Sequence, residues 1–375
     1  MTEWRTYQVG DIAQVFDGPH ATPKKTKEGP WFLSISSLDR GRLDLSESAH
    51  VSEEEFVRWT RRVIPESGDI LFSYETRLGD AALMPGGIRA CLGRRMGILR
   101  PKRDVVIPEF LLFAYLAPSF QETIRSRKIH GATVDRIPLV DLPKWPIRIP
   151  ELAEQRDIAA VLGALNDKIA VNDRVITASI DVCQALYASI SKAAIETSEL
   201  GSVIDLRYGK SLPSVKRKQG SVPVYGSGGI AGSHDEILVP GPGVIVGRKG
   251  TVGAIYWSQE SFFPIDTTFY VSLKRSEIPM EYMYFALQDL KLERMNSDSA
   301  VPGLNRTNAL ATRLRVPATH EASTFVNRVR PLFELKHQRD QESLTLAALR
   351  ETLLPQLMSG KLRVRAAERI VEDAV

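Results

Sequence analysis

Hydrophobic residues follow two different patterns along this chain, and the patterns alternate. Over residues 1–150 and 198–318, short apolar runs are interrupted by glycine and proline, which is typical of short β-strands joined by turns. Over residues 151–197 and 319–364, apolar residues recur in steps of three and four, which predicts long helices. The order is therefore a strand-rich unit, a long helix, a second strand-rich unit and a second long helix.

The first helical segment is too long for the core of one small domain. From Glu151 to Ile195 it contains no proline, and at about 1.5 Å per residue it would reach on the order of 65 Å. It must therefore pack along a partner, for which the second segment is the obvious candidate. Asn172 interrupts the apolar seam and could fix its register, whereas Pro331 predicts a break or a late start in the second helix. The apolar positions are Ile158, Leu162, Leu165, Ile169, Ile176, Ile180, Cys183, Leu186 and Ile190, and then Phe325, Val329, Leu332, Leu335, Leu346, Leu349, Leu353 and Leu357.

The two strand-rich units are copies of one pattern. The match between residues 68–83 and 242–257 has no gap and pairs Gly79 with Gly253. In a third match, a proline precedes a run of aromatic residues, as it does at the first turn of a helix. The matching segments are 7–18 with 198–209, 68–83 with 242–257, 106–116 with 277–287, and 136–150 with 306–317.

These patterns predict an α+β protein with a pseudo-two-fold internal repeat. We expect two α/β domains separated by two long, antiparallel, coiled-coil-like helices. Two similar domains held at a fixed spacing suit a protein that reads two half-sites on a DNA duplex. The expected segments are a first domain at 1–150, a helix at 151–197, a second domain at 198–318, a helix at 319–364 and a tail at 365–375.

Composition excludes several classes of protein. With 375 residues, of which 43% are hydrophobic, the chain can bury a sizeable core. It has no apolar run long enough to span a membrane, and its start is too polar for an export signal, so we expect a cytoplasmic protein with no membrane partner. Cys91 and Cys183 fit no metal or disulfide pattern, and we interpret both as small buried residues.

Charge gives a weak indication of a polyanionic partner. The net charge is +4 and the pI is about 8.9. Two local clusters say more, although either could also be a solvated charged face. One cluster is Lys210, Lys216, Arg217 and Lys218, and the other is Arg89, Arg94, Arg95, Arg100, Lys102 and Arg103, with no acid among residues 89–103.

The strongest local signal is the segment GPGVIVGRKGTVGAIYW at residues 241–257. It predicts a strand, a tight glycine turn carrying Arg248 and Lys249, and another strand. Glycines let a ligand approach the backbone closely, and an Arg-Lys pair can meet phosphates or a guanine edge, although plain hairpin geometry would also explain the segment. A dinucleotide fingerprint at residues 226–229 is disfavoured because Pro240 and Pro242 lead into another strand and not into a helix. A Walker loop at residues 247–251 is rejected because its Gly-Lys-Thr order is scrambled and no helix follows.

We find no catalytic constellation and no metal-ligand spacing, so we expect no catalytic residue and no metal site. The chain lacks a methyltransferase Asn-Pro-Pro-Tyr sequence, a G-x-S-x-G elbow and an H-E-x-x-H helix. Asp266 is the most enzyme-like carboxylate, and a site built from Asp266 and His234 is the enzymatic alternative. A single acid beside two threonines is more often a residue at a turn or strand end.

The motifs resemble those of one family. VPVYGSGGIAGSHDEILVPGPGVIVGRKGTVGAIYW (222–257), followed by FFPIDTTFYV (262–271), is similar to the target recognition domain of type I restriction-modification DNA specificity subunits. IPELAEQRDIAAVLGALNDKI (149–169) resembles the family's central conserved helix, with its Pro-x-x-x-Glu-Gln opening, and LRETLLPQLMSGKLRV (349–364) resembles the distal one. Only the tail RAAERIVEDAV lies outside the resemblance.

The resemblance implies a non-catalytic subunit whose two target recognition domains each read half of a split, asymmetric sequence in double-stranded DNA. Two methyltransferase subunits, carrying S-adenosylmethionine, would dock on the helices and methylate adenine. Restriction subunits, where the system has them, would add cleavage driven by ATP and Mg²⁺. The chain itself would bind no cofactor. A stand-alone, sequence-specific DNA-binding regulator remains the alternative.

The resemblance also suggests DNA-contacting residues. In the second domain Lys210, Lys216, Arg217 and Lys218 are candidates for phosphates, and Tyr225, Ser227, His234, Arg248, Lys249 and Thr251 lie on turns expected to face DNA, with Asn305 and Arg306 near them. In the first domain the candidates are Lys24, Lys25, Ser73, Tyr74, Glu75 and Arg77. Glu75 could accept a hydrogen bond from a cytosine amine. The first domain lacks the Tyr-Gly-Ser-Gly-Gly form, and the second helix opens with PATHEASTF in place of Glu-Gln, so partner docking is expected to differ between the helices.

Overall fold

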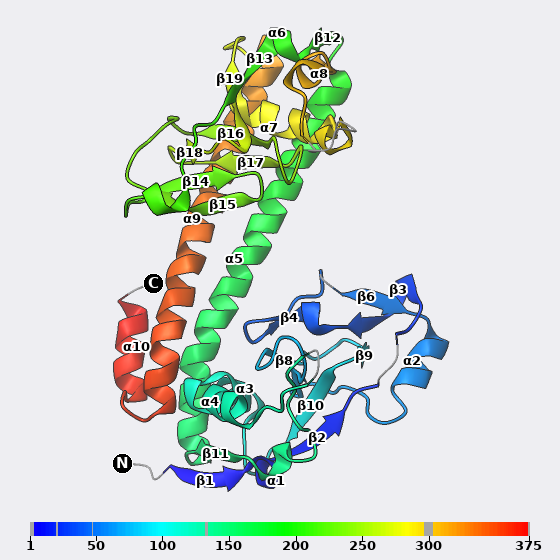
Figure 1. Cartoon of the computed structure of the whole chain (residues 1–375), viewed down its shortest axis with the longest axis vertical. Helices are drawn as coiled ribbons and strands as arrows, with labels where there is room; N and C mark the ends of the chain where they lie inside the picture. The colour runs from blue at the N-terminus through cyan, green and yellow to red at the C-terminus, as the bar shows by residue number, and fades with distance from the viewer. Residues whose placement is uncertain (1–3, 20–21, 47, 132–133, 296–302, 374–375) are drawn as a thin grey trace. The chain divides into compact units, whose positions relative to one another are not determined.

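The computed structural model of the chain describes residues 4–19, 22–46, 48–131, 134–295 and 303–373 (Figure 1). Contacts divide the chain into two units. Unit 1 comprises Met1–Ile169 and Leu344–Val375, and unit 2 comprises Ala170–Ser343. Each unit therefore holds one strand-rich domain together with part of both long helices.

In unit 1 the central sheet is antiparallel, with strand order β2-β10-β7-β8. Because side chains alternate between the faces of a strand, Ile70 and Phe72 enter one apolar cluster and Leu71 enters another. Helix α3 and the long helices contribute to the first cluster. A second sheet, in which β3 pairs antiparallel with β6 and parallel with β9, contributes to the clusters on the other side. The elements are β2 (Ala13–Asp17), β7 (Ile70–Ser73), β8 (Ala81–Leu83), β10 (Met96–Pro101), α3 (Pro108–Leu116), β3 (Lys25–Leu33), β6 (Ala49–Val51) and β9 (Ala90–Leu92).

Unit 2 repeats this arrangement. Its central sheet is antiparallel with order β13-β19-β16-β17, and its second sheet pairs β14 antiparallel with β15 and parallel with β18. Helix α7 lies in the main cluster together with both long helices. The elements are β13 (Ile204–Tyr208), β16 (Gly243–Gly247), β17 (Ile255–Ser258), β19 (Thr268–Leu273), β14 (Val222–Gly226), β15 (Gly229–His234), β18 (Phe263–Pro264) and α7 (Met280–Asp289). The predicted internal repeat and the α+β class are confirmed.

The two ends of each domain pair with one another. In unit 1, β1 (Arg5–Gln8) is antiparallel to β11 (Pro146–Ile149), and in unit 2, β12 (Glu196–Glu199) is antiparallel to β20 (Arg313–Val316). Each domain is thus closed by its own first and last strands before the chain enters a long helix. The remaining elements are α1 (Val9–Ile12), η1 (Ile35–Ser37), β4 (Leu38–Asp39), β5 (Arg42–Leu43), α2 (Glu53–Trp59), α4 (Pro118–Arg127), η2 (Leu142–Lys144), α6 (Leu200–Val203), η3 (Ser214–Lys216), η4 (Leu292–Met295) and α8 (Arg306–Leu310).

The pairing of Gly79 with Gly253 is also found in the structure. Their φ angles are +88° and +75°, in the left-handed region that favours glycine. A Cβ on Gly253 would lie 2.2 Å from the backbone nitrogen of Glu293 in η4, and one on Gly79 would lie 2.1 Å from the side-chain oxygen of Gln121 in α4. Both turns therefore need glycine for conformation and for close packing.

Both long helices are continuous. Helix α5 spans Leu152–Ala193 and α9 spans Thr319–Met358, so the break predicted at Pro331 is wrong. Proline removes one helical N–H, but Val329 and Phe333 on either side of it are 0% and 2% exposed in the core of unit 2. Their burial favours the helical path through the proline.

The two helices pack against each other within each unit. In unit 1, Arg350 Nη1 donates to Asn166 Oδ1 over 2.8 Å, and in unit 2, Asn172 Nδ2 donates to Ser343 Oγ over 3.2 Å. The residue number in α9 decreases from 350 to 343 as the number in α5 increases from 166 to 172. The helices are therefore antiparallel, as predicted. The buried Asn172 makes a polar contact that depends on the register.

The tail forms helix α10, Val364–Glu372, beside the end of α9 (Figure 1). Ala367 is fully buried, and Leu362, Val364 and Val371 pack against the main cluster of unit 1. Burial raises the pKa of Cys91 and Cys183 to about 11, in agreement with their interpretation as buried small residues. In the described residues, no helix combines the length and apolar character needed to cross a bilayer.

Candidate nucleic-acid interface

The glycine turn of unit 2, residues 248–254 between β16 and β17, is fixed by its backbone. Arg248 N donates to Thr267 O over 2.9 Å, and Arg248 O accepts from Leu304 N over 2.9 Å. The next residue, Lys249, also donates its backbone N–H to Thr267 O, over 3.1 Å, and forms a β-bridge with Gly303. We call residues 248–254 the unit 2 recognition turn.

The turn at residues 74–80 of unit 1, between β7 and β8, has the same backbone pattern. Tyr74 N donates to Arg95 O over 3.0 Å, and Tyr74 O accepts from Ile137 N over 2.8 Å. Glu75 then forms a bridge with Arg136. Tyr74 therefore occupies the position of Arg248, and Glu75 that of Lys249. We call residues 74–80 the unit 1 recognition turn.

The side chain of Arg248 is held in place on the surface of unit 2. Its Nη1 donates to the backbone oxygen of Asp266 over 2.8 Å. Its guanidinium carbon lies 5.0 Å from the ring centre of Tyr208 and 5.8 Å from that of Phe269. The residue remains partly exposed, so a held cation is available for an anionic or guanine ligand.

Other predicted residues of unit 2 lie on the same turns. Lys249 and Thr251 are exposed. Ser227 is half-buried: its N–H donates to Thr267 Oγ1 over 3.3 Å, and its carbonyl accepts from the Tyr256 hydroxyl over 3.0 Å. The loops after β14 and β16 therefore both bond to Thr267. Lys249 and Thr251 stay candidates for DNA contact, whereas the backbone of Ser227 mainly fixes the loop.

The predicted phosphate-binding cluster of unit 2 divides into two kinds of residue. Lys210 and Lys216 are exposed, as phosphate contacts require. Arg217 is half-buried and donates to the carbonyl of Ala231, so it is held within the protein. Lys218 is exposed, but its Nζ lies 3.7 Å from an Asp235 carboxylate oxygen, which competes with a phosphate.

Tyr225 is buried, which contradicts its predicted role at the DNA. It is 6% exposed, packs with Ile245 and Phe262, and donates its hydroxyl to Trp257 O over 3.4 Å. Burial raises the pKa of this phenol. The residue fills the space between the two sheets of the domain, because its position on β14 turns the ring inward.

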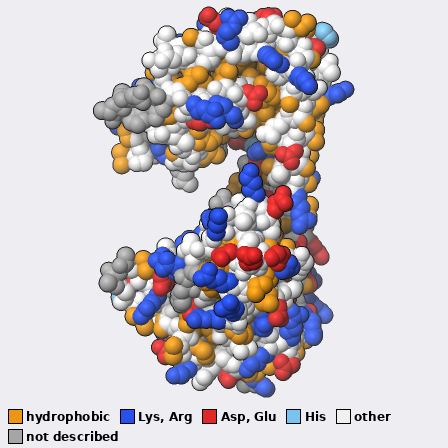
Figure 2. Space-filling view, turned by 90° about the vertical axis from the view of Figure 1, so that its right-hand side faces the viewer, with side chains coloured by type: hydrophobic (Ala, Val, Ile, Leu, Met, Phe, Trp, Pro, Cys, Tyr) orange, Lys and Arg blue, Asp and Glu red, His pale blue; other side chains and the backbone are white. Residues whose placement is uncertain are grey.

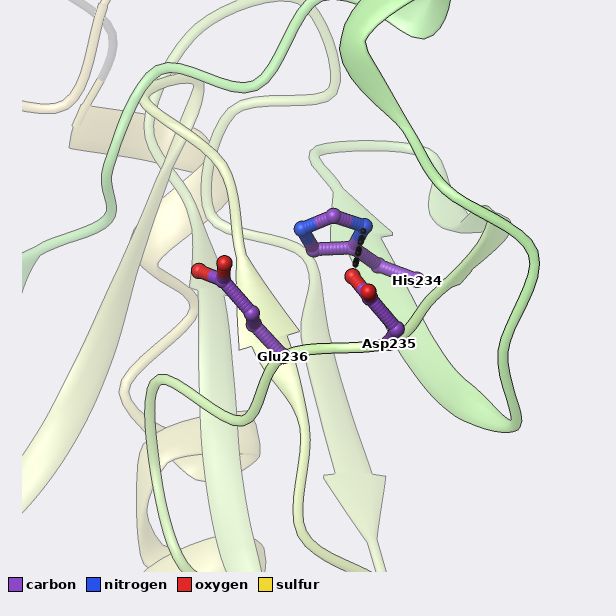
Figure 3. Close-up of side chains that lie close together, drawn as sticks. All are labelled: His234, Asp235 and Glu236. Atoms are coloured by element: carbon purple, nitrogen blue, oxygen red, sulfur yellow. Dashed lines mark ion pairs between the residues drawn. The ribbon is translucent and has the colours of Figure 1, made fainter.

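His234 is also buried, at 3% exposed, and so cannot donate to a base edge as predicted. Its Nδ1 lies 3.1 Å from the backbone nitrogen of Lys218 and 3.1 Å from Asp235 Oδ1 (Figure 3). The backbone N–H can only donate, so Nδ1 is the acceptor and the ring proton lies on Nε2.

His234, Asp235 and Glu236 are the residues in the described part of the chain whose ligand atoms, within 4.8 Å of one another, could surround a cation (Figure 3). Binding through Nδ1 would require displacing the Lys218 N–H. The two carboxylates are exposed, and exposed acids often lie close together without an ion. Asp266, the other half of the enzymatic alternative, is exposed and contributes its backbone carbonyl to Arg248.

Asn305 and Arg306, both predicted near the DNA surface, also have roles in the fold of unit 2. Asn305 caps α8 by accepting from Asn308 N over 3.1 Å. Arg306 donates to Leu206 O over 2.7 Å and forms an ion pair with Asp205. Arg306 thus fastens α8 to β13 through its guanidinium, whereas Asn305 uses only its side-chain oxygen for the cap and is exposed.

In unit 1, Ser73 and Tyr74 are buried, which contradicts their prediction. Ser73 is 0% exposed and donates Oγ to the carbonyl of Glu75 over 2.5 Å. Tyr74 is 5% exposed, and its burial, with the nearby negative charge of Asp17, raises the pKa of its phenol. Strand β7 lies inside the central sheet and is buried on both faces, so successive side chains at its end point into one core or the other.

Arg77 links the unit 1 recognition turn to a neighbouring loop. Its guanidinium donates to the carbonyls of Ile35 and Leu38 over 3.2 and 3.0 Å and pairs with Asp80. These partners engage all three nitrogens of the guanidinium, so a DNA contact by Arg77 would have to compete with them. Lys24 and Lys25 are exposed and remain phosphate candidates.

Glu75 faces a cation that the sequence prediction did not include in the site. Arg95 Nε lies 2.9 Å from Glu75 Oε2, and Arg95 Nη1 donates to Thr76 Oγ1 over 3.3 Å. Thr76 and Arg95 both have positive φ, +68° and +70°, which costs energy for residues other than glycine and is often found at functional sites. Arg95 could have been found from the Arg94-Arg95 pair in the sequence. A cytosine amine would have to compete with Arg95 for Glu75.

Two further cations of the 89–103 cluster, Arg89 and Arg100, are paired with acids within the protein. Arg89 forms a two-bond pair with Glu53 at 2.9 and 2.8 Å, and Arg100 does the same with Asp69 at 2.9 and 2.8 Å. Acids from distant parts of the sequence thus neutralise cations that appear unopposed in the linear chain. On the face shown in Figure 2, Lys and Arg side chains are spread over both units and lie among Asp and Glu side chains and apolar surface.

The Glu-Gln opening of the first long helix has a clear structural role. Gln155 is 1% exposed and donates Nε2 to Val105 O (3.1 Å) and Pro150 O (2.9 Å), while its Oε1 accepts from Ile107 N over 3.0 Å. It therefore fastens the start of α5 to the domain of unit 1. Counting from Pro150 and Pro317, the matching residue of α9 is Ala322, which is 1% exposed.

Comparison with known proteins gives a consistent result. A family model for the type I restriction modification DNA specificity domain matches residues 1–180 and 193–342. The putative type I restriction enzyme MjaX specificity subunit of Methanocaldococcus jannaschii is 19% identical over 412 residues, covering 97% of this chain and 94% of that protein. The crystal structure of the type I restriction-modification system S subunit from M. genitalium has the same fold, with a TM-score of 0.66, 20% identity, and coverage of 95% of this chain and 96% of that one.

These matches do not support a stand-alone regulator. The matched family provides DNA recognition and not catalysis. This chain belongs to the family of type I restriction-modification DNA specificity subunits.

Proposed function

We propose that the chain recognises a bipartite DNA sequence, one half by the strand-rich domain of each unit. The observation that supports this is the repeat itself. Both domains have the same sheet order and a recognition turn with the same backbone bonds, yet the turns carry different side chains, Tyr74 and Glu75 in one and Arg248 and Lys249 in the other. One scaffold with two sets of side chains suits two different half-sites.

In this proposal the chemistry belongs to partner subunits. Two methyltransferase subunits dock on the long helices and methylate adenine, and restriction subunits, where the system has them, cleave DNA. S-adenosylmethionine is then held by the methyltransferase subunits, and ATP and Mg²⁺ by the restriction subunits. Flipping a base and transferring a methyl group need a pocket that partner subunits supply. The helices would also hold the two domains at the spacing of the half-sites.

Adenine methylation across a host genome tests the proposal. The chain is expressed with a methyltransferase subunit from the same host, and methylated sites are sequenced. We expect a bipartite motif, of which one half changes when residues 1–148 are exchanged for those of another family member. Sequence-specific binding by the isolated chain, with no methylation when the methyltransferase is present, would instead support a regulator.

A further inference from the structure

An exposed aromatic ring lies beside the unit 2 recognition turn. Tyr208, at the end of β13, is 57% exposed, which is unusual for a large ring that also packs against the protein. Its ring meets Phe269 edge to face at 4.9 Å and carries the Arg248 guanidinium at 5.0 Å. Neither the linear pattern nor the resemblance singled out Tyr208.

The guanidinium of Arg248 is therefore oriented before any ligand arrives. The backbone of Arg248 is fixed on both sides by Thr267 and Leu304, and one nitrogen of the side chain is fixed by the Asp266 carbonyl. The Tyr208 ring lies against the guanidinium in a cation–π contact and so adds a third support for the side chain. Nε and Nη2 have no other partner among the residues that the structure describes. A ligand would bind without the cost of ordering a long side chain.

We infer that Tyr208 is a positioning residue that holds Arg248 to read a guanine in the half-site of unit 2. The inference rests on the proposed function. The planar guanidinium can donate two parallel hydrogen bonds to O6 and N7 of guanine in the major groove, a geometry that lysine does not offer.

A guanine is a better ligand for Arg248 than a phosphate. Phosphate contacts need charge but little orientation, and the freely exposed Lys210 and Lys216 provide it in the same domain. Asp266, whose carbonyl holds Arg248, also carries an exposed carboxylate, which disfavours a second anion nearby. A neutral base edge avoids that repulsion.

Unit 1 does not contain this pair. Asp17 occupies the position of Tyr208, because each residue ends its strand, β2 or β13, and is followed by a glycine. Both glycine N–H groups donate to a backbone oxygen of the neighbouring strand, over 3.0 Å for Gly18 and 3.1 Å for Gly209. The position of Arg248 is taken by the buried Tyr74. The guanine reader is accordingly assigned to unit 2 alone.

The test uses the chain assembled with its methyltransferase subunits and a duplex carrying the motif that the complex methylates. Each guanine of the unit 2 half-site is replaced in turn by 7-deazaguanine, which lacks the N7 acceptor. For the unaltered complex we expect one replacement to weaken binding about tenfold. In Arg248→Ala the same replacement has no further effect, because the group that senses N7 is gone.

Variants of Tyr208 separate positioning from packing. Tyr208→Phe keeps the ring and should keep the response to 7-deazaguanine, whereas Tyr208→Leu should lose most of it while binding to unrelated DNA stays unchanged. Lys210→Ala is the matched control: it should weaken binding to every duplex alike and leave the response intact.

The result can overturn either conclusion separately. If no guanine of this half-site is sensitive in the unaltered complex, or if Arg248→Ala retains the sensitivity, the guanine reader is wrong. If Tyr208→Leu responds like the unaltered complex, Tyr208 has no positioning role. If the unaltered complex methylates no bipartite motif, the proposed function fails before this test begins. The analogue measurement on the unaltered complex needs no variant to fold.

Discussion

The two recognition turns have one backbone and opposite chemistry. At equivalent positions, unit 1 carries Glu75, neutralised by Arg95 at 2.9 Å, and unit 2 carries Lys249, which has no ion pair with a described residue. The preceding position is a buried tyrosine in unit 1 and a held arginine in unit 2. The glycines and strands preserve the scaffold, whereas the side chains at the turn are free to differ, so the fold alone cannot specify the sequence recognised.

The helix openings differ in a parallel way. In unit 1, Gln155 bonds the start of α5 to the domain through both ends of its amide. In unit 2, Ala322 takes that position, and Glu321 instead accepts from the Ala318 N–H at the helix start over 3.1 Å. The start of α5 is thus hydrogen-bonded to its domain by Gln155, whereas the start of α9 is capped by Glu321 of the same helix.

The largest expected difference between the units comes from their turn glycines. Gly253→Ala should lower the free energy of unfolding by about 2–5 kcal/mol, from a left-handed φ and a clash with backbone that cannot move. Gly79→Ala should cost less, about 1–3 kcal/mol, because the clash is with the side chain of Gln121, which can swing away. Urea unfolding of the full chain measures both, and equal losses would show that the two turns are packed alike.

The helix openings provide the next test. Gln155→Ala should destabilise unit 1 by about 2–3 kcal/mol, because part-buried backbone groups of Val105 and Ile107 lose their partner. Glu321→Ala removes only a cap in unit 2, and should cost about 1 kcal/mol. Hydrogen exchange at the Ile107 amide should accelerate in the first variant and not in the second. No change at Ile107 would contradict the fastening role.

Charge at the turns should affect DNA affinity with opposite signs. Lys249→Ala should weaken binding of the assembled complex by about 1 kcal/mol and reduce the salt slope by about one. Glu75→Gln should strengthen binding slightly, because it removes a negative charge and frees Arg95. Titration with cognate duplex at several salt concentrations measures both. Weaker binding by Glu75→Gln would mean that its carboxylate contacts a base.

The smallest effects are expected from the two buried tyrosines. Tyr225→Phe loses one long hydrogen bond of 3.4 Å, and Tyr74→Phe removes a buried hydroxyl that lies near the carboxylate of Asp17. Each should change the free energy of unfolding by less than about 1 kcal/mol, and neither should change the methylated motif. A changed methylation motif in either variant would show that the tyrosine hydroxyl contributes to DNA recognition.

The sequence predicts the architecture well because the architecture depends on local periodicity. The two helices, the repeat and the equivalence of Gly79 with Gly253 follow from spacing alone. The exception is Pro331, where tertiary packing of Val329 and Phe333 overrides a local preference.

The site was harder to predict because it depends on contacts between distant residues. A strand pattern does not say which face is inward when both faces are buried, so the sequence does not reveal the burial of Ser73, Tyr74 and Tyr225. Ion pairs such as Arg89 with Glu53 join residues far apart in sequence. The partial neutralisation of the 89–103 cluster therefore cannot be seen from the linear sequence. The exposed Tyr208 had no local motif to mark it.

Duplicating one domain tests the central claim most directly. Because β1 pairs with β11 and β12 with β20, residues 5–149 can be replaced by a second copy of residues 196–316 at matching strand ends. Expressed with the methyltransferase, the duplicated chain should methylate a motif whose two halves are the same sequence, the one that residues 196–316 specify in the native chain. A motif that keeps its original first half would contradict the claim that each domain reads its own half-site.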